Sequence, residues 1–148
     1  MSMTPESVRA RLRDRGQAYA RHAPAPDTLA RVSLGLMLLL AGFHKLLAPA
    51  AWALYVTDWL APFLVVTPTQ FMLINGYLEI AFGLALVVNR YTAFAAFVAA
   101  VSLTATVGYL ALVVLLENGR YGDVLVRDVG LAGLAWAVLL DALRPVSR

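Results

Sequence analysis

The sequence predicts an all-α membrane protein, a bundle of four transmembrane helices with its N- and C-termini in the cytoplasm. The chain is 61% hydrophobic and 14% charged, whereas soluble domains are about 45–50% apolar and about 25% charged. Long apolar runs recur along it, each close to the ~20 residues that cross a bilayer as a helix. If the apolar runs cross the membrane in turn, most basic residues lie on one side of it.

Residues 1–27 form a polar arm that carries more basic than acidic side chains. Thr4-Pro5-Glu6 predicts a helix start, with a threonine cap, proline at the first position and an early acid. Val8, Leu12 and Tyr19 give a thin apolar stripe. We expect either a short helix on the cytoplasmic membrane surface, attracted by anionic lipids, or a solvated basic tail.

Residues 28–148 form the predicted membrane domain. Its first span reaches full length if Arg31 snorkels at one end and His44 and Lys45 lie at the other. The apolar core of this span follows a basic region, as in a signal peptide, but the basic region is too long and further spans follow. The four spans are predicted at about 28–47, 69–88, 91–116 and 124–143.

The segment between the first two spans, residues 48–67, is apolar but broken by Asp58 and Pro62. It predicts a short helix in the outer interface, followed by a turn at Thr67-Pro68. The part from 59 to 67 could instead be a re-entrant piece. Three aromatic residues suit the interface, and their spacing predicts one helical face: Trp52, Tyr55 and Trp59.

The basic residues predict the orientation. With a cytoplasmic N-terminus the positive-inside rule is obeyed, because nine basic residues lie inside and three outside: Arg9, Arg11, Arg13, Arg15, Arg21, Arg31, Arg90, Arg144 and Arg148 against Lys45, Arg120 and Arg127. Small residues let membrane helices approach closely, so we expect helix contacts at Gly35, Gly42, Ala81, Ala85, Ala95, Ala99, Gly130 and Gly133.

A layer of polar residues is predicted in the outer half of the bundle. A carboxylate in hydrocarbon is costly, so Glu79 should face the interior with a partner. Lys45 and Arg127 are the candidates, but Glu79 lies about 15 Å along its helix, so the spacing guarantees neither. The same groups could instead fix helix register or anchor the interface. The layer comprises His44, Lys45, Asn75, Glu79, Tyr109, Arg127 and Asp128.

Metal sites are not expected. The chain has no cysteine, which excludes disulfides, zinc–thiolate sites and iron–sulfur clusters. Its two histidines, His22 and His44, fall on opposite membrane sides and cannot jointly hold a haem, and copper ligands are also lacking. Electron transfer would therefore need a bound quinone or a partner subunit that carries the cofactor.

Three stretches resemble the DoxX family of small four-helix membrane proteins. The first runs from Arg31-Val-Ser-Leu-Gly35 to Ala-Gly42-Phe-His-Lys45-Leu. The second is Gly76-Tyr-Leu-Glu79-Ile-Ala-Phe-Gly83-Leu-Ala-Leu. The third, Arg127-Asp128-Val-Gly-Leu-Ala-Gly133, opens the last span. The resemblance covers about residues 30–143 and leaves out the basic arm and the Trp-bearing segment 50–62.

This resemblance implies a membrane subunit linked to quinone-dependent redox systems, at most part of a quinol oxidase or a thiosulfate:quinone oxidoreductase. It marks Lys45, Glu79, Arg127 and Asp128 as functional or structural determinants. Lys45, His44 or Tyr109 could donate to the carbonyls of a quinone, and Glu79 could exchange the accompanying proton. Two alternatives stay open. One is a non-catalytic scaffold whose basic arm recruits a partner, and the other is a small transporter with Glu79 as proton relay.

Overall fold

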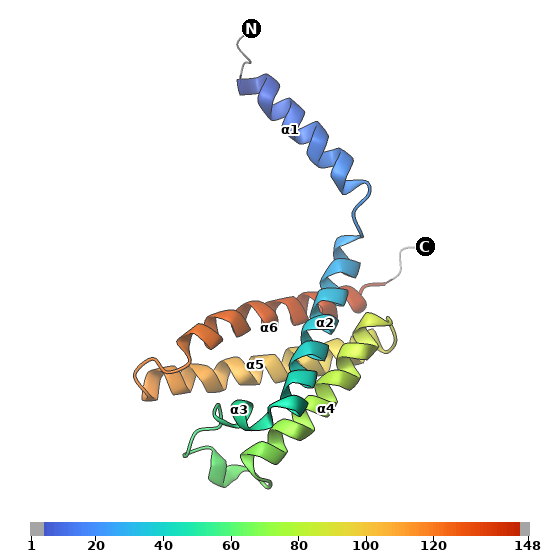
Figure 1. The fold of residues 1–148 in the computed structure, drawn as a ribbon. Coiled ribbons are helices and arrows are strands. Elements are labelled where there is room, and N and C mark those ends of the chain that lie inside the picture. The colour runs from blue at the N-terminus through green and yellow to red at the C-terminus, as the bar shows by residue number, and fades with distance from the viewer. Residues whose placement is uncertain (1–4, 146–148) are drawn as a thin grey trace.

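Six α-helices and one short 3-10 turn make up residues 5–145, the part of the chain that this computed structural model describes (Figure 1). The predicted all-α class is confirmed, and the four predicted spans agree with long helices to within two residues at each end. In chain order the elements are α1 Pro5–Ala20, α2 Pro26–Leu47, α3 Pro49–Ala53, η1 Ala61–Phe63, α4 Pro68–Val87, α5 Thr92–Leu116 and α6 Gly122–Ala142.

Three of these helices, α2, α4 and α5, are long and apolar enough to cross a membrane. The chain is therefore an integral, multi-pass membrane protein. The fourth long helix, α6, has 21 residues but is not in that set. It carries four charged side chains, more than any of the other three long helices: Asp123, Arg127, Asp128 and Asp141.

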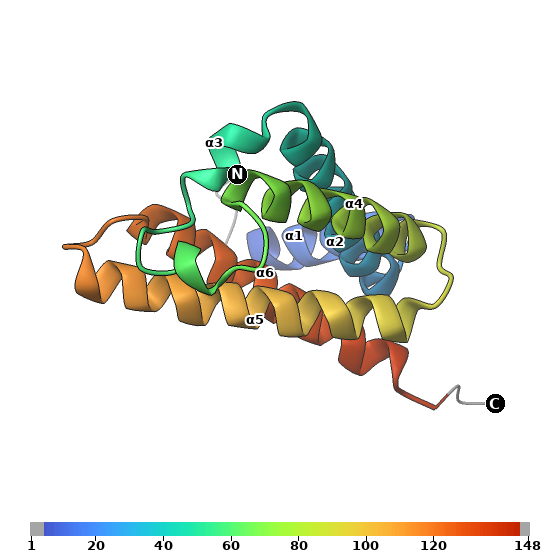
Figure 2. The same cartoon turned by 90° about the horizontal axis from the view of Figure 1, so that it is seen from below.

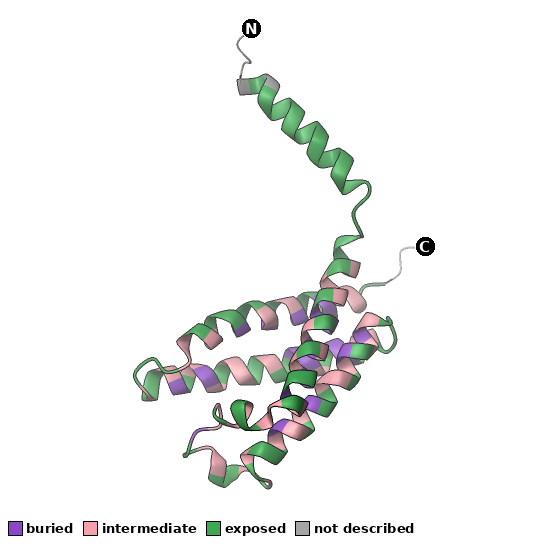
Figure 3. Cartoon of the chain, in the orientation of Figure 1, coloured by how far each residue is buried: buried purple, intermediate pink, exposed green. Residues whose placement is uncertain are grey.

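The long helices pack as two pairs, α2 with α4 and α5 with α6. Figure 2 shows the pairs as two layers, and Figure 1 shows that the first pair crosses the second. Their shared core lies where the start of α2 and the end of α4 meet the start of α5 and the end of α6, and it contains Leu34, Leu38, Leu86, Ala95, Ala99, Ala135, Val138 and Leu139. Most remaining apolar side chains are exposed or half-buried (Figure 3), as is expected where helices face lipid.

Glycines let α2 and α4 touch through their backbones. A Cβ atom built on Gly42 would lie 2.7 Å from the carbonyl oxygen of Gly76, and one built on Gly83 would lie 2.7 Å from that of Gly35. Real Cβ atoms essentially never come this close to another atom. Because the partners are seven residues apart on each helix, the two antiparallel helices meet at two points on one face.

The expected helix contacts of α6 are wrong in detail. Gly130 and Gly133 are exposed, and a Cβ on either would meet nothing within 4 Å. The helix instead turns Ala132, Ala135 and Val138 into the interior. On α4 and α5, Ala81 is likewise exposed and Ala85 is half-buried, whereas Ala95 and Ala99 are buried as predicted.

Helix α4 begins where the sequence predicts a turn and ends at a cap supplied by α2. Thr67 and Gln70 form a reciprocal capping box, and Pro68 occupies the first helical position. At the other end, Arg31 donates hydrogen bonds to the carbonyl oxygens of Leu86 and Val87. The Leu86 carbonyl also accepts from the Asn89 amide over 3.2 Å. Arg31 adds to this helix end and ties the start of α2 to the end of α4.

The interfacial helix is shorter than its aromatic spacing predicts. Helix α3 ends at Ala53, so Trp52, Tyr55 and Trp59 do not share one helical face. The helix ends early because the Tyr109 hydroxyl hydrogen-bonds to the Tyr55 carbonyl and the Thr57 amide. In a longer helix these two backbone groups would instead find partners within the helix. The chain then passes through η1 to reach α4.

Helix α1 stands apart from the bundle (Figures 1 and 3). From Val8 to Ala20 every residue is exposed, and a non-helical linker of residues 21–25 separates it from α2. The predicted cap, Thr4, lies outside the described residues, but the helix starts at Pro5 as expected.

Candidate functional site

Lys45 and Glu79 form an ion pair inside the bundle. Lys45 lies in the last turn of α2 and Glu79 near the middle of α4, and the lysine ammonium donates a hydrogen bond to the Glu79 Oε1 atom. The two side chains are only 10% and 23% exposed. The sequence allowed this pair without requiring it, and the structure selects it over the pairing of Glu79 with Arg127.

The glycine contact explains why Lys45 can reach Glu79. Gly76 lies one turn before Glu79 on α4, and a Cβ built on it would lie 3.1 Å from the Lys45 Cβ. The lysine stem therefore starts directly against the α4 backbone. Its ammonium needs to extend by only one helical turn, about 5 Å, to meet the carboxylate.

The second oxygen of Glu79 is left without a partner. Its Oε2 atom is buried and has no hydrogen bond to any described residue. A buried carboxylate oxygen without a partner costs free energy. Asp128, 6% exposed at the start of α6, is close enough for its charge to repel that of Glu79. The site thus holds one ammonium between α2 and α4, with two buried carboxyl groups nearby.

Trp52 covers the ion pair on the α3 side. The Lys45 ammonium lies 4.6 Å from the centre of the indole ring, a cation–π distance. The indole Nε1 donates to His44 Nδ1 over 2.7 Å. In a neutral imidazole this leaves the proton on Nε2, so exposed His44 presents a free donor on that nitrogen.

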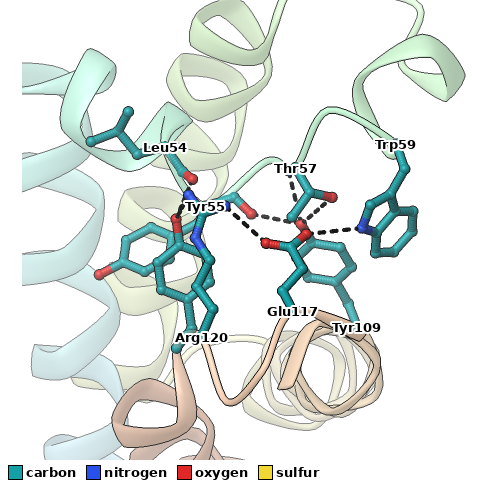
Figure 4. Close-up of polar contacts among 8 residues, drawn as sticks. Leu54, Tyr55, Thr57, Trp59, Tyr109, Glu117 and Arg120 are labelled. Carbon is teal, nitrogen blue, oxygen red and sulfur yellow. Dashed lines mark hydrogen bonds and ion pairs between the residues drawn. The ribbon is translucent and has the colours of Figure 1, made fainter. Parts of the chain in front are cut away.

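A second polar cluster lies at the same end of the bundle and fastens the segment after α3 to α5 (Figure 4). The Tyr109 hydroxyl of α5 donates to the Tyr55 carbonyl over 2.6 Å and accepts from the Thr57 amide over 3.0 Å. Thr57 is 3% exposed. Nearby, Trp59 donates to Glu117 over 3.2 Å and packs its ring against Tyr109.

The loop between α5 and α6 completes this cluster. Arg120 donates to Glu117 over 2.8 Å and to the Tyr121 hydroxyl over 2.7 Å, and Tyr121 donates to the Leu54 carbonyl. The hydrogen bond to Glu117 raises the pKa of the Arg120 guanidinium. Edge-on and tilted ring contacts among His44, Trp52, Tyr55 and Tyr121 link the two clusters.

The structure brings together only part of the predicted polar layer. Lys45 and Glu79 meet, with Asp128 nearby, but the Tyr109 hydroxyl bonds to the loop after α3. Asn75 donates to the Phe71 carbonyl of its own helix over 2.9 Å. Arg127 bonds to its neighbour Asp128 over 2.9 Å, while its side chain is 56% exposed.

Several members of the two clusters were not among the predicted site residues, including Trp52, Thr57 and Gly76. Trp52 is recognisable in the sequence as an interfacial aromatic, but its place over Lys45 depends on the short α3 turn. Gly76 falls in the motif around Glu79, and a glycine one turn from a buried acid is a usable signal of close helix approach. Thr57 carries no such signal.

Within residues 5–145 no group of three or more His, Cys, Asp or Glu side chains is placed to hold a metal ion.

Comparison with known families agrees with this architecture. The sequence profile of the DoxX family matches residues 27–114. The chain belongs to the DoxX family. The match spans α2 to α5, so it includes Lys45, Glu79 and Tyr109 but ends before α6, whereas the resemblance in the sequence extends to about residue 143. No curated protein and no solved structure matches the chain.

Proposed function

We propose that this DoxX protein is a four-span subunit of a quinone-dependent redox system in the cytoplasmic membrane, and that Glu79 and Lys45 bind a quinone head group. The observation that carries the proposal is the buried Glu79 carboxylate, which has one oxygen on Lys45 and the other without a partner among the described residues. A hydroxyl of a bound quinol fits this acceptor.

Packing and charge support the proposed four-span topology. Helix α6 lies against α5, and its uncharged centre runs from Val129 to Leu140 between charged ends. An even number of spans puts both termini on one side, and the distribution of basic residues favours the cytoplasm as that side. The site then lies in the outer half of the membrane.

A bound quinone couples electron transfer to proton transfer. Glu79 accepts or returns the proton at Oε2, because this oxygen is the free acceptor of the site. Lys45 offsets the charge of the carboxylate and offers a donor for a carbonyl group. His44 offers a further donor at Nε2, and Trp52 keeps water from the ammonium. Asp128 and Arg127 set the electrostatic surroundings, and a partner protein exchanges the electrons.

The test is the quinone content of the purified protein. The chain is purified in mild detergent, its lipids are extracted, and quinone per mole of protein is measured by mass spectrometry. We expect near-stoichiometric quinone in the native chain and in the Asp123→Asn control, which neutralises an exposed carboxylate at the start of α6. We expect its loss in Glu79→Gln and in the Glu79→Gln, Lys45→Ala double variant.

Retention of quinone in a folded double variant would contradict the proposal, and a circular dichroism spectrum establishes that the variant is folded. A native protein without quinone but with a stable protein partner would favour a non-catalytic membrane scaffold, in which the ion pair only joins α2 to α4. Proton uptake by vesicles that requires Glu79 but no quinone would favour a transporter.

A further inference from the structure

The function proposed for the bundle makes no use of α1, whose side chains are exposed from Val8 onward. We propose that α1 is a lipid-binding helix that lies on the inner membrane surface and recognises anionic phospholipid head groups. This inference is independent of the quinone site.

The arrangement of side chains around the helix supports a surface position. Val8, Leu12 and Tyr19 are 37%, 66% and 83% exposed. Their spacings of four and seven residues place them on one face of α1. Nothing in the bundle covers this face, because α1 projects away from it (Figure 1).

Arginines border the apolar stripe on both sides. Arg9 lies three positions before Leu12 and Arg15 three positions after it, and on a helix these positions fall on opposite flanks. Arg13 follows Arg9 by one turn, and Arg11 precedes Arg15 by one turn. The acids lie away from the stripe, with Glu6 and Asp14 on the other side of the helix. Such an arrangement fits an interfacial helix that inserts a narrow apolar face between anionic head groups.

The attachment of α1 also favours lipid over a soluble partner. Only residues 21–25 separate α1 from α2, a helix apolar enough to span the membrane. Under the proposed orientation the start of α2 is at the cytoplasmic surface, so α1 stays within reach of the inner leaflet, whose anionic lipids attract basic segments. Tyr19, next to the linker, is a residue type that favours this interface.

The chain's lack of cysteine permits a direct test. Leu12→Cys and Asp14→Cys variants of the full chain are labelled with an environment-sensitive fluorophore and placed in bilayers of phosphatidylcholine with or without phosphatidylglycerol. Lipids with a spin label near the head group serve as quenchers. In the presence of phosphatidylglycerol we expect a blue shift and several-fold stronger quenching at position 12 than at position 14. Molar salt should remove most of the difference, because the attraction is electrostatic.

Replacement of Arg9, Arg11, Arg13 and Arg15 by Gln should abolish the response to phosphatidylglycerol while the bundle stays in the bilayer. Equal, water-like signals at both positions in both lipids would overturn the proposal. A blue shift at position 12 that appears only after a cytoplasmic extract is added would also overturn it, and would assign the helix to a protein partner.

Discussion

Lys45 and Glu79 stabilise each other because each reduces the cost of burying the other's charge. Removal of one partner from a buried pair costs about 3–5 kcal/mol, since the remaining charge is left uncompensated, whereas replacement of both costs less. The nearby carboxyl group of Asp128 makes an unpaired Glu79 still less favourable.

The first prediction is therefore a double-mutant cycle on this pair. Lys45→Ala should lower the free energy of unfolding by several kcal/mol, and the Lys45→Ala, Glu79→Gln double variant should recover part of the loss. Unfolding can be followed in mixed micelles by the fluorescence of the three tryptophans. Additive effects of the two substitutions would show that the pair contributes nothing to stability.

The second prediction concerns the hydrogen bonds of the Tyr109 hydroxyl. Its hydroxyl donates a hydrogen bond to the Tyr55 carbonyl and accepts one from the Thr57 amide, and Thr57 is buried. Tyr109→Phe should cost about 1–3 kcal/mol in free energy of unfolding, because these backbone groups lose their partner. Tyr77→Phe is the matched control, since the Tyr77 side chain is 66% exposed. Equal stability of the two variants would show that water replaces the lost hydroxyl.

At the scale of helices, the close contact of α2 and α4 fixes where Lys45 starts. The third prediction compares two identical substitutions. Gly42→Ala places a methyl group 2.7 Å from the Gly76 carbonyl oxygen and should destabilise the protein by about 1–3 kcal/mol. Gly108→Ala meets nothing within 4 Å and should be neutral or stabilising by about 0.5–1 kcal/mol, because alanine favours helix.

Unfolding titrations of both alanine variants measure this difference. Gly42→Ala should also reduce quinone content if the site binds quinone, because a wider gap between the helices moves Lys45 away from Glu79. A Gly42→Ala variant as stable as Gly108→Ala would mean that α2 and α4 separate without penalty, and that the glycines do not hold the pair together.

The helices were predictable from the sequence, but their contacts were only partly so. Apolar runs of fixed length locate α2, α4 and α5, because hydrocarbon thickness sets helix length. Residue size correctly predicted contacts at Gly35 and Gly42 but wrongly predicted them at Gly130 and Gly133. The registry that puts Gly42 against Gly76 is a contact between two helices that residues 48–67 separate in the chain. No local sequence pattern specifies it. The hydrogen bonds from Tyr109 to Tyr55 and Thr57 were not predictable for the same reason, because they join residues that are far apart in the sequence.

The choice of partner for Glu79 shows this limit most clearly. Lys45 and Arg127 carry the same charge and lie at similar expected depths, so charge alone does not decide between them. The close approach of α2 and α4 decides which residue pairs with Glu79, because the backbone contact at Gly76 brings Lys45 within reach of its carboxylate. Arg127 instead bonds to Asp128 and stays half-exposed. Predicting the polar groups was therefore easier than predicting how they pair.

At the scale of the whole molecule, the proposed topology makes the last prediction. If α6 spans the membrane, Arg144 lies on the same side as Arg90; if it does not, Arg144 lies with Asp123. Single cysteines at these three positions, all exposed in the structure, can be labelled in intact cells with a membrane-impermeant maleimide. The background is free of other thiols because the chain contains no cysteine.

We expect Asp123→Cys to react in intact cells, and Arg90→Cys and Arg144→Cys to react only after the membrane is permeabilised. The charges of α6 make this outcome informative, because Arg127 and Asp128 must sit in the outer half of the bilayer beside Glu79 if the helix spans. Labelling of both Asp123→Cys and Arg144→Cys, but not of Arg90→Cys, in intact cells would leave α6 on the outer surface. Asp128 would then be an interfacial residue, and the ion pair would lie at the edge of a three-span bundle.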